Sequence, residues 1–183
     1  GVSVTSPTAL PLRGGDQVRV CLQLNQPAYL YVLWIEAEGE VLPVYPWREG
    51  KWSRRPPEVS PRMYLALPDE LDHGWTMQVQ KDGLETLLLL ARSRRLPRGF
   101  KLRELVEPAL HPLAAKTSRA AWFQDGRLLS KSAPRPSRET LRPPDLDAVI
   151  GINDPLLKMH RRLARLLAPH FKLVRGVSFP VEK

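Results

Sequence analysis

A basic and aromatic segment at residues 46–58 has the residue types best suited to binding chemistry. It is polar and interrupted by proline, and its tryptophans stand among cations: Trp47, Arg48, Lys51, Trp52, Arg54 and Arg55. Cations beside indole rings can bind an acidic peptide, a phosphate or a single nucleic-acid strand through charge and stacking. The alternative, which the sequence favours, is that both tryptophans cap a hydrophobic core while the arginines stay hydrated. Trp75, which follows Gly74, fits either role.

A second candidate surface lies on a predicted helix at residues 155–169. Apolar side chains recur on one side of this helix, and the opposite side has four cations: Lys158, Arg161, Arg162 and Arg165. Such an amphipathic pattern predicts that the apolar side packs on the core. The basic side could contact nucleic acid or an acidic protein, although a merely solvated face is the commoner role.

The common catalytic motifs are absent from the sequence. It contains no G-x-S-x-G or S-x-x-K motif, no phosphate-binding glycine loop, and no Cys pair or i, i+4 His pair suited to a metal. Cys21 lies in an alternating segment with Arg19 and Gln23, so we expect a partly exposed thiol without a catalytic role. We predict no enzyme activity, no cofactor and no metal; a hydrolase whose site is assembled from distant residues remains an alternative.

The histidines and the two acidic clusters are expected to have structural or solvated roles. The four histidines are expected to be structural or on the surface: His73, His111, His160 and His170. The acidic clusters at residues 36–40 and 69–72 lack the spacing of a Ca²⁺-binding loop. We therefore predict that both clusters are solvated turns.

Length and composition indicate one globular domain of ordinary size. The chain has 183 residues, of which 43% are hydrophobic, and this is enough for a substantial core. It has no apolar run of about 18 residues, so no membrane contact is expected. One cysteine allows no internal disulfide, and we expect a cytoplasmic protein. Because the sequence starts at Gly1, we expect it to be part of a longer protein.

The positive charge belongs to the second half of the chain. Residues 1–91 contain 8 Lys and Arg against 11 Asp and Glu, whereas residues 92–183 contain 20 against 8. The net charge of +9 is therefore the sum of a mildly acidic first half and a strongly basic second half. This asymmetry favours an acidic partner, or an acidic neighbouring domain, as the binding target.

Short extended segments separated by turn residues predict a mainly β fold. We expect an edge strand at residues 2–5, a meander of the segments 16–24, 28–35 and 40–45, and further strands at 63–67, 75–79 and 85–92. The last of these is almost continuously apolar and is predicted to be a central strand. The pattern indicates an antiparallel β-sandwich-like domain with a C-terminal helix and a final strand.

The expected division places a β-sandwich-like core at residues 1–96 and a C-terminal extension at 97–183 on the same core. The extension should contain a short helix within 100–113, a hairpin around Asp125-Gly126, a flexible loop at 130–144, the helix at 155–169 and a strand at 173–179. Asn153 or Asp154 should cap the long helix, with Pro155 in its first turn.

Several of these motifs occur in the order found in a bacterial family. The motifs are Gly15-Asp16, Ala28-Tyr29-Leu30-Tyr31, Leu42-Pro43-Val44-Tyr45-Pro46 and Gly83-Leu84-Glu85. Over residues 12–96 the chain resembles a bacterial domain-of-unknown-function family with a Gly-Asp, Ala-Tyr-Leu-Tyr and hydrophobic-x-Pro pattern. Its members are accessory modules of Ser/Thr kinases, caspase-like peptidases or repeat proteins. Residues 122–126 and 175–179 also resemble the tails of large bacterial kinase-type proteins.

The sequence and this resemblance together suggest a non-catalytic accessory module of a multidomain bacterial signalling or defence protein. We expect it to bind a protein partner or its own catalytic domain through polar loops on a strand scaffold. Nucleic-acid binding by the basic second half is the main alternative.

Overall fold

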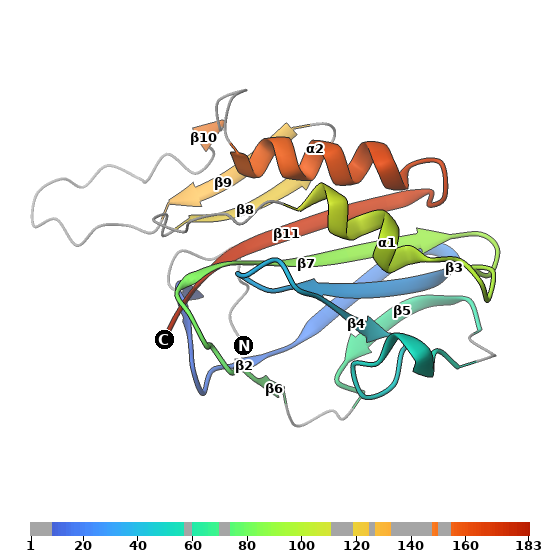
Figure 1. Cartoon of the computed structure of the whole chain (residues 1–183), viewed down its shortest axis with the longest axis horizontal. Helices are drawn as coiled ribbons and strands as arrows, with labels where there is room; N and C mark the ends of the chain where they lie inside the picture. Colours follow the sequence, from blue (N-terminus) through green and yellow to red (C-terminus); the bar gives the residue numbers. More distant parts are fainter. Residues whose placement is uncertain are drawn as a thin grey trace, which may run out of the picture.

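A mainly β fold with two helices on one face is seen in the computed structural model (Figure 1). The structure describes residues 9–56, 60–69, 74–110, 119–124, 127–132, 148–149 and 155–183, with backbone alone for the described residues between 119 and 149. No helix in this part of the chain is long and apolar enough to cross a membrane.

The main sheet contains strands from both halves of the sequence. Its spatial order is β10 (Ala148–Val149), β9 (Arg127–Ser132), β8 (Arg119–Gln124), β11 (Leu173–Glu182), β7 (Gly83–Arg92), β3 (Val20–Ile35) and β4 (Val41–Tyr45). All these neighbours are antiparallel. The predicted central strand is confirmed, because β7 lies between β3 and β11 and is buried along almost its whole length.

The predicted meander is wrong at its first step, because residues 20–35 form one long strand rather than two paired strands. Val20–Gln23 pair with β5 (Arg62–Leu67), whereas Tyr29–Ile35 pair with β7. The register with β5 shifts between Gln23 and Ala28, where Pro27 has no backbone N–H to donate. The irregularity therefore divides β3 between two layers without ending it.

The two halves of β3 produce the expected sandwich. The first half packs with β5 and with the small sheet of β2 (Gln17–Val18) and β6 (Trp75–Thr76), so the strand predicted at 75–79 is shorter than expected. Their apolar side chains form one core with the facing side of the main sheet. Members of this core include Val20, Leu22, Leu65, Leu89 and Phe179. The predicted fold class, an antiparallel sandwich-like domain with a C-terminal helix and final strand, is confirmed.

Both helices cover the opposite face of the main sheet (Figure 1). α1 (Leu102–Val106) continues into the 3-10 turn η3 (Glu107–Ala109), where Pro108 interrupts the α-helical hydrogen bonds. α2 (Pro155–Leu167) begins with the predicted first-turn proline. Its buried stripe packs on alternate residues of β3 and β7, and includes Leu156, Leu157, Met159, Leu163 and Leu167.

Some predicted features lie outside the described residues. These are the edge strand at 2–5, the turn at Asp125-Gly126 and the helix cap at Asn153 or Asp154. Of the loop predicted at 130–144, residues 130–132 belong to β9 and the rest lies outside the described part. The hairpin itself is confirmed by the pairing of β8 with β9.

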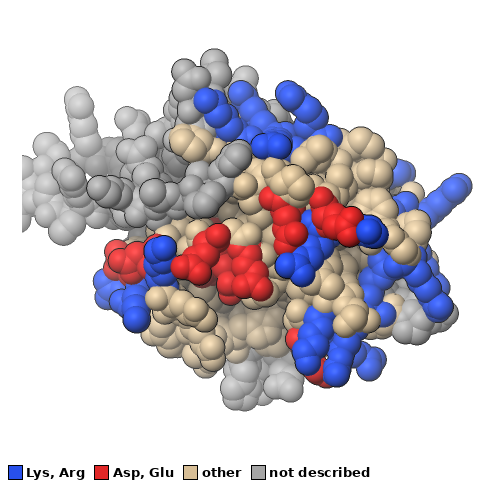
Figure 2. All heavy atoms as spheres, viewed as in Figure 1, with Lys and Arg blue, Asp and Glu red and all other residues tan. Residues whose placement is uncertain are grey.

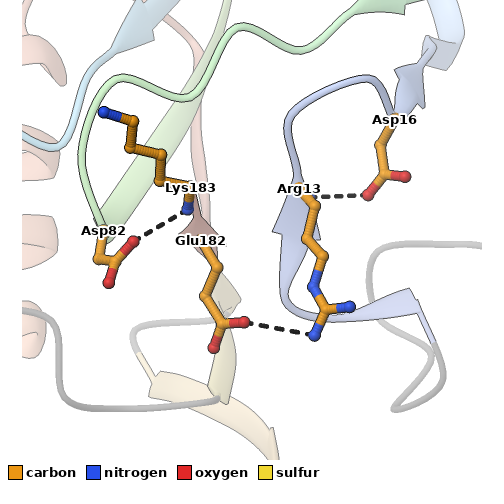
Figure 3. Close-up of polar contacts among 5 residues, drawn as sticks. All are labelled: Arg13, Asp16, Asp82, Glu182 and Lys183. Carbon is orange, nitrogen blue, oxygen red and sulfur yellow. Dashed lines mark hydrogen bonds and ion pairs between the residues drawn. The ribbon is translucent and has the colours of Figure 1, made fainter.

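The C-terminal strand is also tied to the start of the fold. β1 (Leu12–Arg13) runs parallel to the end of β11, and Arg13 Nη2 lies 3.5 Å from Glu182 Oε2 (Figure 3). The Arg13 amide donates to Asp16 Oδ2 at 2.7 Å, which closes a turn whose Gly15 has a φ of +93°. The Lys183 amide donates to Asp82 Oδ1 at 2.9 Å. These exposed contacts fix register more than they add stability.

A buried polar chain joins α2 to the centre of the sheet. His160 Nε2 lies 2.8 Å from Ser178 Oγ, which lies 2.6 Å from Thr86 Oγ1. All three residues are buried. Burial lowers the pKa of His160 to about 4, because an imidazolium would be desolvated there. The His160 ring fits only because Gly176 has no side chain: a Cβ at Gly176 would lie 2.5 Å from ring atoms Cε1 and Nδ1.

Replacing Gly176 by alanine should therefore destabilise the protein. The added methyl group would push His160 and α2 away from β11, and we expect a loss of about 1–3 kcal/mol in the free energy of unfolding. Denaturant unfolding measures it. Gly99→Ala is the matched control, since nothing lies within 4 Å of a Cβ there. Equal unfolding midpoints for the two variants would contradict this packing.

His160 should also make stability depend on pH. Its folded pKa, about 4, lies below the unfolded value of about 6.5, so the unfolded state binds more protons between these values. The stabilisation is complete above pH 6.5 and is lost as pH falls toward 4. Relative to His160→Gln, the wild type should lose about 2–3 kcal/mol between pH 7 and pH 4.5 in denaturant titrations. Parallel pH profiles for both proteins would show that His160 does not titrate in this way.

Candidate protein-binding pocket

The basic and aromatic segment folds back over the end of the helix-covered core. Trp47 is 7% exposed, and its ring centroid lies 6.0 Å from that of Tyr31 and 5.1 Å from that of Trp52. Trp52 belongs to the 3-10 turn η2 (Trp52–Arg54), is half-buried, and donates from Nε1 to the Val41 carbonyl at 3.2 Å. The packing role predicted for the tryptophans is confirmed for Trp47, and Trp52 packs against the same core.

A pocket of about 960 Å³ opens beside these rings. Its apolar wall consists of aromatic and proline side chains from β3, from the segment after β4 and from the segment after β7: Tyr29, Tyr31, Trp47, Trp52, Pro97 and Phe100. Tyr31 is fixed there because its hydroxyl accepts the Leu96 amide at 2.8 Å. Burial raises the pKa of Tyr31, so the hydroxyl stays neutral at physiological pH.

Cations dominate the charged side chains of the pocket. They come from the β4–β5 segment, from the connector after β7 and from the start of α1: Arg55, Arg95, Arg98, Lys101 and Arg103. Glu104 is the one acidic residue among the lining residues that the structure describes. It lies 2.8 Å from Lys101 Nζ, and Arg103 Nε donates to Glu107 at 2.5 Å. The pocket thus keeps a positive excess, which favours an anionic ligand.

Arg55 joins two of the segments that form the pocket. Its Nη2 donates to the Pro97 carbonyl at 2.6 Å, and this contact joins the β4–β5 segment to the connector after β7. The remaining guanidinium donors have the fork geometry that matches a carboxylate. The pocket can therefore hold apolar or aromatic groups against its wall and carboxylates at its rim.

The structure brings together only part of the predicted binding set. Trp47, Trp52 and Arg55 line this pocket. The other cations of the segment are exposed and lie outside its lining, where Lys51 and Arg54 pair with Glu49 and Arg48 is exposed at the surface. The α2 cations Arg161, Arg162 and Arg165 are exposed on the outer side of that helix, over which Figure 2 shows Lys and Arg atoms.

Trp75 belongs to a second, smaller pocket of about 280 Å³. This second pocket lies on the face of the main sheet opposite the helices. Trp34, which lines it, points to one side of β3, whereas Tyr31, which lines the first pocket, points to the other side. The two predicted candidate surfaces are therefore separate, and Trp75 lies apart from the pocket that contains Trp47 and Trp52.

Sequence reasoning missed most of the residues that line the first pocket. Tyr29 and Tyr31 share a face of β3 by strict alternation, and this signal was available in the sequence. Arg95, Arg98 and Lys101 stand in a connector whose basic character was visible, but nothing local indicated that it would lie against Trp52. That contact depends on β4 and β7 lying on either side of the same strand.

The described residues form no metal-binding cluster. They contain no group of three His, Cys, Asp or Glu side chains placed to hold a metal ion. A Ser–His contact exists between Ser178 and His160, but it is sealed in the core, since Ser178 is 0% exposed. Cys21 is exposed, as predicted.

Comparison with known proteins gives one family match. Residues 11–95 match a family model described as a domain of unknown function (DUF4384). The matched segment runs from β1 to the connector after β7 and excludes both helices and β11. No curated protein and no solved structure matches the chain. Residues 11–95 are therefore similar to this family. The match supports the resemblance to a domain of unknown function, and it does not extend to an association with kinases or peptidases.

Proposed function

We propose that this chain is a non-catalytic interaction module that binds an acidic segment of a protein in the 960 Å³ pocket. The segment belongs either to a separate partner or to the catalytic domain of its own multidomain bacterial signalling or defence protein. The observation that carries the proposal is the combination of an aromatic wall with five cations and a single carboxylate in one pocket.

The physical chemistry favours a peptide segment as the ligand. The pocket volume is at the upper end of the range for ligand sites, so it has room for two or three side chains. Carboxylates would accept from Arg98 and Lys101 at the rim, and an apolar side chain would pack on Trp52 and Phe100. Partial exclusion of water strengthens these charge contacts relative to open solvent. Anchors of this kind, aromatic and arginine side chains, dominate protein interfaces.

The non-catalytic part of the proposal is supported by the residue types at the two pockets. Neither pocket has a histidine or cysteine among the described residues that line it. A Ser or Cys nucleophile activated by a histidine, the arrangement expected for the hydrolase alternative, would need such a residue in the pocket.

Nucleic-acid binding is the second candidate function, and one observation favours it. Lys158, Arg161, Arg162 and Arg165 are all exposed on α2, and basic atoms gather at this edge of the molecule in Figure 2. A phosphate backbone could lie along such a helix. Because no residue of α2 lines the pocket, mutations can separate the two functions.

A binding assay with matched double variants tests the proposal. The probe is a fluorescein-labelled decapeptide of alternating Glu and Phe, and its partner probe has Gln in place of Glu. Arg98→Gln with Lys101→Gln should weaken binding of the Glu peptide by about tenfold. Arg161→Gln with Arg165→Gln removes the same charge from α2 and should change the affinity for the Glu peptide by less than about twofold.

The outcomes discriminate clearly. Equal binding of the Glu and Gln peptides, or equal loss in both double variants, would contradict an acidic ligand at the pocket. A labelled single-stranded oligonucleotide is measured in parallel at low and high salt. Tighter binding of the oligonucleotide, lost in the α2 variant alone, would replace the proposal by the nucleic-acid function.

A further inference from the structure

The second pocket has the opposite chemistry to the first. Its walls are indole rings, a thioether and aliphatic side chains, and its charged groups are two carboxylates: Trp34, Trp75, Met77, Leu42, Glu36 and Glu85. Figure 2 shows acidic atoms gathered near the position of the β3–β4 hairpin in Figure 1. No cation lines this pocket among the residues that the structure describes.

Two tryptophans form adjacent walls of the pocket. The ring centroids of Trp34 and Trp75 are 6.3 Å apart, and their planes meet at 80°. Phe179 holds Trp34 from the core side, with 5.7 Å between ring centroids. Faces of indole rings attract cations, and the attraction grows when water is excluded.

Glu85 is the anchor of the site. It is 7% exposed, and its Oε2 accepts a hydrogen bond of 2.6 Å from Trp34 Nε1. In the described part of the chain its other oxygen, Oε1, has no donor and no ion-pair partner. This oxygen is not sealed from solvent, because no buried side-chain N or O atom lacks a hydrogen-bond partner. Because Glu85 lines the pocket, we take Oε1 as the acceptor that Glu85 can offer to a ligand there.

Burial of these carboxylates without a cation is costly, and their pKa values reflect it. Desolvation is the main cause that raises the pKa of both Glu85 and Glu36. The charge of Glu36 raises the pKa of Glu85 further, and the charges of Glu40 and Glu38 raise that of Glu36. The nearby cation Lys81 pairs with Glu38 instead, at 3.6 Å. A bound cation would remove this penalty.

Backbone contacts fix each of the two sides of the pocket. Met77 donates its amide to the Asp16 carbonyl at 2.8 Å and accepts from the Gly15 amide at 3.1 Å, which fixes the β6 side. On the other side Gly83 lies so close to Ala37 that an added Cβ would be 2.2 Å from the Ala37 Cβ. This approach brings the turn after Glu36 against the start of β7, where Glu85 stands. The site is therefore preformed.

We propose that this pocket binds the side chain of a lysine or arginine of a protein partner, with its alkyl part between Trp34, Trp75 and Met77 and its N–H group donating to Glu85 Oε1. A volume of about 280 Å³ suits one such side chain. Two carboxylates beside indole rings offer too few oxygen ligands for Ca²⁺ or Mg²⁺. A quaternary ammonium has no N–H to donate and satisfies the aromatic walls only.

NMR of the tryptophan indole N–H groups tests this site directly. The Trp34 and Trp75 signals are assigned with Trp34→Phe and Trp75→Phe. The probes are a capped Ala-Lys-Ala peptide, its Ala-Gln-Ala analogue, butylammonium and tetramethylammonium. The lysine peptide should shift both signals saturably and leave those of Trp47 and Trp52 in place. The glutamine analogue should not shift them. Tetramethylammonium should bind more weakly than butylammonium.

Substitution of one carboxylate separates a specific contact from general charge. Glu85→Gln keeps an oxygen acceptor for Trp34 and should weaken lysine-peptide binding by about tenfold or more. Glu40→Gln is the matched control, because Glu40 is exposed in the turn between β3 and β4 and does not line the pocket; it should change binding by less than about twofold.

Three results would overturn the proposal. They are the lack of a saturable Trp34 shift up to about 50 mM peptide, equal binding by the Glu85→Gln protein, and tetramethylammonium binding as tight as butylammonium. A shift with butylammonium but none with the lysine peptide would reject a protein side chain as the ligand and leave a free amine. None of these results depends on the first pocket, whose residues are unchanged in every variant.

Discussion

The pairing of β7 with β3 on one side and β11 on the other is the constraint from which the rest of the structure follows. β7 is buried on both faces, so apolar layers must cover it from both directions. Successive residues alternate between these layers: Leu88 and Leu90 pack under the helices, whereas Leu87 and Leu89 pack under the β-layer. The C-terminal strand β11 thus completes a sheet whose other central strands come from the first half of the chain, and Gly176 lets α2 lie directly on it.

The same alternation in β3 gives the molecule two pockets of opposite chemistry. Tyr29 and Tyr31 point to the helix-covered face and meet the basic connector after β7. Trp34, on the other face, meets Glu85 and Trp75. One rigid strand therefore positions an anion-favouring pocket toward one end and a cation-favouring pocket toward the other. An interaction module with both could fix the direction as well as the identity of a bound segment.

Local patterns in the sequence predicted the elements better than their partners. The apolar run of β7 and the amphipathic period of α2 are local signals, and both elements were correctly predicted. The continuity of β3 was not predicted. Pro27 marks an irregularity, but the same residue is compatible with a turn between two strands and with a register shift inside one strand. The central place of β11 was also hidden, since strand order depends on contacts between distant segments. For this reason Trp47 and Trp52 were found but Tyr31, Arg98 and the Glu85 pocket were not assembled.

The proposal that binds these observations together is that an acidic segment of a protein binds in the first pocket. Chemical-shift mapping of the Glu–Phe peptide on the isotope-labelled chain tests it most directly. We predict that the largest shifts fall on the Trp52 indole and the amides of Leu96, Arg98 and Lys101, with those of α2 nearly unchanged. Shifts confined to residues 158–165, or no shift in the pocket at peptide concentrations that bind, would contradict it.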